Sequence, residues 1–196
     1  MKHLSTFLLF IIATITIACN GVNDDSVNDV IDKVTRYLNN EDYNSIKTLS
    51  DTVSKNPDLG LAVINCTKDS SALLYETMIA SMVTPQIAAE VLITDMLDMP
   101  VNSNNSKLIR LRVMNIISTY SKIGNDKNTL IFKHAIDSCF STRTINEQAK
   151  LYTLSTPPAQ LGKIVKKEPN NNAIIEAIKL QYTNQSDIVL FQNALK

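Results

Sequence analysis

The chain has 196 residues, of which 44% are hydrophobic and 19% charged, and its formal net charge is zero. These values are typical of a globular protein rather than a disordered one, and a nucleic-acid partner is disfavoured because it requires clustered Lys and Arg. The four glycines are too far apart for a phosphate-binding or dinucleotide-binding loop. Composition therefore excludes several classes of function and selects none.

The first predicted element is a secretory signal peptide. Lys2 precedes an unbroken apolar run at residues 7–13, and the run continues to Ala18 with Thr14 and Thr16 interleaved. A charged start, an apolar core of roughly ten residues and a small residue before a break are typical of such a signal. The run is shorter than the about 20 residues that span a bilayer, although an uncleaved signal would serve as an N-terminal anchor.

The residues that end this run, Thr16-Ile17-Ala18-Cys19, resemble the lipobox of bacterial lipoproteins. In that pattern a branched aliphatic residue, a small or aliphatic residue and a small residue precede an invariant cysteine, and Thr16 stands here where Leu is usual. The resemblance implies that residues 1–18 are a signal peptide and that the Cys19 sulfur carries diacylglycerol, with acyl chains such as palmitate. Two or more acyl chains anchor a protein stably, whereas one does not. The alternative is an ordinary cleaved signal in which Cys19 lies near the cut by chance.

The resemblance also bears on location. In Gram-negative lipoproteins an Asp directly after the cysteine favours retention in the inner membrane, and this chain has Asn20. The outer membrane is thus slightly favoured, with the rest of the protein facing the periplasm or the exterior of the cell envelope. Residues 19–25 predict a short lipid-anchored tether, and residues 26–196 are long enough for a single domain with a sizeable core.

Residues 26–196 predict an all-α domain of many short helices, because no alternating strand pattern appears. Ser26, Ser70-Ser71 and Ser186 are predicted N-caps, Pro85 is a predicted first helical residue, and 102–106 is a predicted loop. Helix pairs of this kind also suggest a solenoid-like helical repeat. Apolar residues recur at helical spacing in about 26–38, 43–53, 59–66, 71–82, 85–99, 107–123, 129–140, 142–154, 161–165, 169–182 and 186–195.

Two cysteines, Cys66 and Cys139, remain after Cys19. In an oxidising envelope compartment they are a candidate disulfide, which would join the early helices to the late ones. Their helical neighbours are apolar, so two separate buried thiols are the alternative. Pairing requires Cα atoms within about 7 Å of each other, and the sequence leaves both alternatives open.

The remaining residues with metal-binding or nucleophilic chemistry favour structural roles. His134 lies five residues before Cys139 on a predicted helix, so the two point to different faces, and a partly buried structural histidine is expected. One histidine without a cysteine cluster does not make a usual zinc site. Thioethers bind Cu(I), but methionines at helical spacing more often fill a core, which applies to Met78, Met82, Met96 and Met99. No metal or other cofactor is expected.

Three carboxylates, Glu90, Asp95 and Asp98, lie on or near one predicted helix. Paired carboxylates perform acid–base catalysis, yet along an amphipathic helix they usually form its solvated face. The leading hypothesis is a non-enzymatic, membrane-anchored module that binds another envelope or secreted protein. The alternative is an envelope hydrolase whose site is assembled from these scattered carboxylates or from His134.

Overall fold

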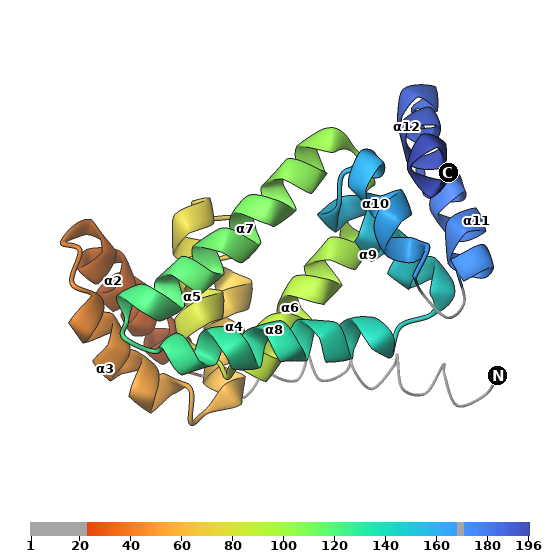
Figure 1. Cartoon of the computed structure of the whole chain (residues 1–196). Coiled ribbons are helices and arrows are strands. Elements are labelled where there is room, and N and C mark those ends of the chain that lie inside the picture. The colour runs from red at the N-terminus through yellow and green to blue at the C-terminus, as the bar shows by residue number, and fades with distance from the viewer. Residues whose placement is uncertain (1–22, 168–170) are drawn as a thin grey trace, which may run out of the picture. The chain divides into compact units, whose positions relative to one another are not determined.

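The structure is a computed structural model that describes residues 23–167 and 171–196 (Figure 1). Over these residues the chain forms eleven helices and no strand, which confirms the predicted all-α class. The predicted signal peptide, Cys19 and most of the predicted tether lie outside the described residues. Among the helices described, none combines the length and the apolar composition that crossing a membrane requires.

The helices follow one another through short turns, and contacts group them into two compact units. The first unit holds the first four helices together with Asn115–Asp126, and the second holds Pro85–Met114 and Lys127–Lys196. In chain order the helices are α2 (Asp24–Asn39), α3 (Tyr43–Val53), α4 (Pro57–Cys66), α5 (Ala72–Ser81), α6 (Pro85–Asp98), α7 (Ser103–Lys122), α8 (Asp126–Ser141), α9 (Ile145–Ser155), α10 (Pro158–Val165), α11 (Asn171–Gln181) and α12 (Gln185–Leu195).

The first unit is built around α5. Residues 75–81 of this helix are all buried, as expected for a helix covered on every side, and α2, α3 and α4 all contact it. A Cβ at Gly60 of α4 would lie 2.2 Å from the carbonyl oxygen of Met82, so this close approach requires glycine. The core face of α2 consists of three valines at helical spacing, namely Val27, Val30 and Val34.

The helices of the second unit pack in an alternating order. α9 packs mainly against α11 and also contacts α6, whereas α10 packs mainly against α12 and contacts α9 and α11 less. A Cβ at Gly162 of α10 would lie 2.7 Å from the Cβ of Ala194, so a glycine allows α10 and α12 to touch. This packing does not establish a repeated sequence unit, so the helical repeat stays a prediction. The core of these helices is a cluster of buried residues, namely Ala149, Leu161, Val165, Ile174, Ala177, Ile178 and Phe191.

Two helices begin earlier than predicted because asparagines, not serines, cap them. The side chain of Asn23 accepts a hydrogen bond of 3.0 Å from the amide of Asp25, so α2 already includes the end of the predicted tether. The predicted cap at Ser26 is therefore wrong. At α12 the side chain of Asn184 accepts from the amide of Ser186 at 2.9 Å, so Ser186 lies inside the helix instead of capping it.

The predicted loop at 102–106 is also mostly helical. Asn102 accepts a 2.8 Å hydrogen bond from the amide of Asn105, and the Asn- and Ser-rich run forms the first turn of α7. Other signals hold, since Ser71 caps α5 as predicted. Gly124, two residues after α7, has a φ of +66°. This left-handed conformation terminates the helix, and glycine adopts it at little cost in free energy.

Candidate functional site

The three predicted carboxylates do not share one environment. Asp95 is buried on α6, and its Oδ2 accepts a hydrogen bond from Nη1 of Arg112 on α7 at 3.0 Å. The expectation that Asp95 belongs to a solvated face is therefore wrong. It lies on the side of α6 that also buries Leu92, and a charge in that position needs an opposite charge nearby. Asp98, at the end of the same helix, is exposed.

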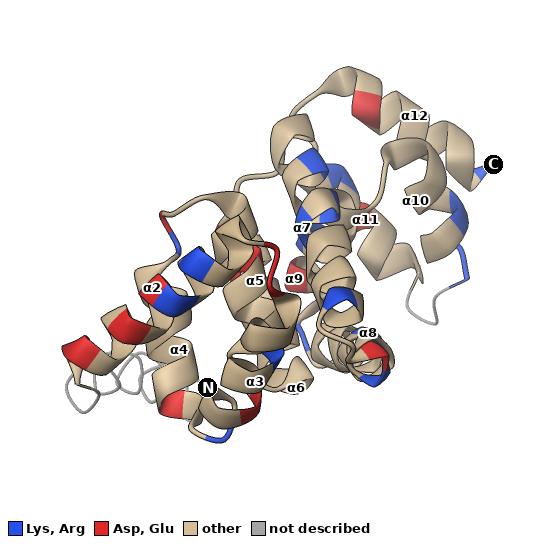
Figure 2. Cartoon of the chain, turned by 90° about the vertical axis from the view of Figure 1, so that its left-hand side faces the viewer, with Lys and Arg blue, Asp and Glu red and all other residues tan. Residues whose placement is uncertain are grey.

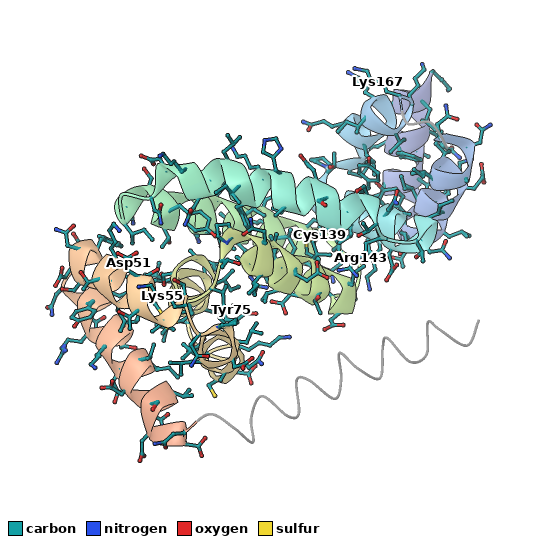
Figure 3. All side chains as sticks on the ribbon, turned by 90° about the horizontal axis from the view of Figure 1, so that it is seen from below. Asp51, Lys55, Tyr75, Cys139, Arg143 and Lys167 are labelled. Atoms are coloured by element: carbon teal, nitrogen blue, oxygen red, sulfur yellow. The ribbon has the colours of Figure 1, made fainter. Side chains whose placement is uncertain are left out.

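Glu90 belongs to a second ion pair, and Cys139 lies beside this pair. Its Oε1 lies 2.6 Å from Nη2 of Arg143, the middle residue of the turn between α8 and α9. Cys139 lies on α8 one turn before Arg143 (Figure 3). Burial, and then the hydrogen bond and negative charge of Glu90, raise the pKa of Cys139 to about 11. The thiol therefore stays protonated near neutral pH and is a poor nucleophile.

The remaining predicted residues are more exposed than expected. Cys66 is the last residue of α4 and is exposed, and not buried as the alternative to the disulfide required. Both thiols are free and belong to different units, and a Cys66–Cys139 disulfide stays a prediction. His134 is exposed on α8, not partly buried, because the core side of that helix is at Phe132. Two residues correspond to a rotation of about 200° around a helix.

The methionines contribute to the cores of the two units. Met78 and Met82 are completely buried in the first unit, and Met96 is buried in the second, where Met99 is half-buried. Buried thioethers in these positions fill irregular space between helices. Within the described part of the chain, no three His, Cys, Asp or Glu side chains gather into a group that could hold a metal ion.

Two pairs of large apolar side chains are exposed on consecutive helices of the chain, in residues that belong to the second unit. Leu111 and Met114 of α7 are 46% and 64% exposed, and they share a face because they are three residues apart. Leu130 and Ile131 of α8 are 61% and 40% exposed. We call these four residues the α7/α8 apolar pairs.

Basic residues flank the apolar pairs. Lys107 lies one turn before Leu111 on α7, and Lys127 and Lys133 lie three residues on either side of Leu130 on α8. Figure 2 shows α7 with basic segments alone. Its twenty residues include no Asp or Glu and four bases, namely Lys107, Arg110, Arg112 and Lys122.

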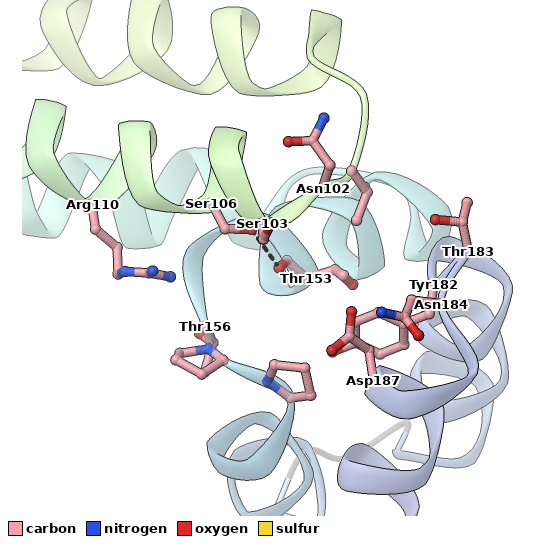
Figure 4. A pocket seen from close by; sticks show the side chains of 13 residues that line it. Asn102, Ser103, Ser106, Arg110, Thr153, Thr156, Tyr182, Thr183, Asn184 and Asp187 are labelled. Carbon is pink, nitrogen blue, oxygen red and sulfur yellow. Dashed lines mark hydrogen bonds between the residues drawn. The ribbon is translucent and has the colours of Figure 1, made fainter.

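The second unit also contains a pocket of about 420 Å³ (Figure 4). Three segments form it: the start of α7 with the preceding residues, the turn between α9 and α10, and the turn between α11 and α12. Most of its lining residues have polar side chains, and the lining comprises Val101, Asn102, Ser103, Ser106, Arg110, Thr153, Thr156, Pro157, Pro158, Tyr182, Thr183, Asn184 and Asp187.

Several polar groups of the pocket are fixed in orientation and still have unsatisfied hydrogen-bonding capacity. Arg110 and Asp187 lie on opposite sides of it (Figure 4), and over residues 23–167 and 171–196 neither forms an ion pair. Asn102 and Asn184 cap α7 and α12 with their carbonyl oxygens, which leaves their amide nitrogens without acceptors among those same residues. The Tyr182 hydroxyl is buried without a hydrogen-bond partner there, and burial, followed by the charge of Asp187, raises the pKa of Tyr182.

Sequence reasoning found neither the pocket nor the apolar pairs. The pocket draws its residues from three distant segments between Val101 and Asp187, and the only local signals were the two capping asparagines. The residues of the apolar pairs fall inside predicted helices, and whether such a residue is exposed depends on which neighbours cover its face of the helix. Comparisons with protein-family models, curated proteins and solved structures find no match to this chain.

Proposed function

We propose that this chain is a lipid-anchored envelope protein that acts without catalysis and binds another envelope or secreted protein through the α7/α8 apolar pairs. The observation that carries the proposal is the exposure of four large apolar side chains on two helices that also carry lysines near them. Protein interfaces commonly combine an apolar centre with a polar rim and are enriched in Met. The complementary partner presents apolar side chains surrounded by Asp and Glu.

The expected strength of this contact follows from the side chains involved. Complete burial of a Leu, Ile or Met side chain contributes about 1.5–3 kcal/mol relative to full exposure. Each residue of the apolar pairs is already partly covered, so its contribution is smaller. Removing two of them together still weakens binding by more than tenfold, because about 1.4 kcal/mol corresponds to a factor of ten.

The test is co-purification from solubilised envelopes of the protein's own cell. One variant combines Leu111→Ser with Met114→Ser, a second combines Leu130→Ser with Ile131→Ser, and the matched control is Leu180→Ser. Leu180 is 83% exposed in the same unit. We expect a partner that the unchanged protein and the control retain and that both paired variants lose, while all four proteins still unfold cooperatively. Failure of the unchanged protein to retain any partner, or equal retention by all four proteins, would contradict the proposal.

The anchor at Cys19 has its own measurement, which is the intact mass of the protein extracted from membranes. We expect the mass of residues 19–196 plus diacylglycerol and acyl chains, as the lipobox resemblance of Thr16-Ile17-Ala18-Cys19 implies. An unmodified mass would exclude the lipid anchor. The same spectrum, recorded with and without reductant, tests the Cys66–Cys139 disulfide by its gain of two hydrogens on reduction.

A further inference from the structure

The pocket in the second unit carries opposite charges on opposite walls. The guanidinium of Arg110 and the carboxylate of Asp187 both point into it from different sides (Figure 4). Neither is neutralised by an ion pair among the described residues, so each remains available to a ligand. The volume of about 420 Å³ is within the range of small-molecule pockets, about 300–1,000 Å³.

The groups between these charges suit a ligand with hydrogen-bonding groups and a small apolar part. The amide nitrogens of Asn102 and Asn184 are free donors, and N-capping fixes the orientation of both side chains. Pro158 and the ring of Tyr182 contribute apolar surface to the lining.

We propose that this pocket binds a small zwitterion of the short-peptide class, with its carboxylate on Arg110 and its ammonium group on Asp187. The planar guanidinium matches a carboxylate with two parallel hydrogen bonds, and a carboxylate accepts from an ammonium group. The asparagine amides donate to the peptide carbonyl between the two ends. This site is separate from the α7/α8 apolar pairs, so either site can bind without the other.

The experiment titrates L-alanyl-L-alanine into the full-length protein in detergent by calorimetry, beside two blocked forms. The N-acetylated form lacks the ammonium group and the C-terminal amide lacks the carboxylate. We expect the free dipeptide to bind at least about tenfold more tightly than either, because hydrogen bonds between charged groups contribute more than 1.4 kcal/mol.

Two variants assign each end of the ligand to its wall. Arg110→Gln should bind the free dipeptide and its amide equally, and Asp187→Asn should bind the free and N-acetylated forms equally. The matched controls are Lys107→Gln, on the same helix, and Asp98→Asn, neither of which lines the pocket. Both controls should keep the affinity of the unchanged protein. All four variants should keep its melting temperature, because none of the four side chains is buried.

Three results would overturn the proposal. The first is the absence of binding at about 10 mM dipeptide, which would saturate a site with a Kd of 1 mM. The second is equal binding of the free and blocked dipeptides by the unchanged protein, which would mean that the charged ends of the ligand do not contribute to binding. The third is tighter binding of phosphoethanolamine, a zwitterion without a peptide group, which would assign the pocket to a lipid headgroup instead.

Discussion

At the scale of single residues, burial decides what a charged side chain does in this protein. Asp95 and Arg112 have side chains that are 5% and 10% exposed and form an ion pair of 3.0 Å. Removing one partner of such a pair leaves the other charge uncompensated at a cost of about 3–5 kcal/mol, whereas replacing both by apolar residues costs much less. Asp95 is therefore a structural carboxylate, although its residue type also suits a catalytic role.

We predict that Asp95→Leu lowers the free energy of unfolding by about 3–5 kcal/mol and that adding Arg112→Met restores most of it. Urea unfolding measures both values. Asp98→Asn, at an exposed position of the same helix, is the control and should stay within about 0.5 kcal/mol. If the double variant were less stable than the single one, the two side chains would not act as a pair.

The two free cysteines should differ in reactivity. With a pKa of about 11 for Cys139, only about three thiols in ten thousand are thiolates at pH 7.5. We predict that iodoacetamide labels the exposed Cys66 first, and that labelling of Cys139 rises about tenfold per pH unit up to about pH 11. Peptide mass spectrometry measures both rates.

The carboxylate beside Cys139 supplies the internal check on this prediction. Glu90→Gln removes a negative charge that raises the pKa of Cys139, so labelling of Cys139 should become faster at pH 7.5. Equal labelling of both cysteines in the unchanged protein at that pH would show that the thiol of Cys139 is not held protonated. Protection of both cysteines until reductant is added would instead indicate the disulfide.

At the scale of elements, two helices of the second unit approach more closely than side chains normally allow. A Cβ at Gly162 would meet the Cβ of Ala194 at 2.7 Å and the carbonyl oxygen of Phe191 at 2.9 Å. In an uncrowded helix interior, Gly→Ala stabilises by about 0.5–1 kcal/mol. Crowding against backbone atoms has the opposite sign and costs about 1–3 kcal/mol.

We therefore predict that Gly162→Ala destabilises the protein, measured as a lower melting temperature. Adding Ala194→Gly removes the shortest contact and should restore part of the loss, since the backbone contacts remain. An increase in melting temperature for Gly162→Ala would show that α10 and α12 do not touch at this glycine.

The existence of the helices was predictable because apolar spacing is a local property. α3 was predicted at 43–53 and is Tyr43–Val53, and the proline at the start of α6 was predicted from its place after Thr84. Helix ends were less predictable, because Asn and Ser have similar capping preferences. Asn23 and Asn184 cap helices for which a nearby serine was the predicted cap, and Asn102 caps a helix where a loop was predicted.

Contacts between distant residues could not be predicted in this way. Asp95 and Arg112 are 17 residues apart in the sequence, and Glu90 and Arg143 are 53 residues apart. Because the partners lie on different elements, the spacing of residues along one helix does not predict either ion pair. The same reason hides the pocket, whose two charges come from α7 and α12. For this reason a solvent-exposed face was predicted for Asp95, and no sequence pattern indicated Arg110 or Asp187 as binding residues.

At the scale of the whole molecule, the first unit is organised around a buried helix, and the second carries both candidate binding features. The apolar pairs suit a protein surface, since interfaces commonly combine an apolar centre with a polar rim. The pocket suits a small molecule because of its volume. The proposed division of labour thus places recognition in the second unit and, through the predicted anchor at Cys19, attachment at the other end of the sequence.

The most direct measurement is photo-crosslinking in intact envelopes, with a photoreactive amino acid at Met114 or Leu130 and, as the control, at Glu176. All three positions are exposed in the same unit. If the α7/α8 apolar pairs contact a protein, Met114 and Leu130 should each give one discrete, heavier adduct that Glu176 does not give. No adduct from either position, or the same adducts from Glu176, would contradict binding through this surface.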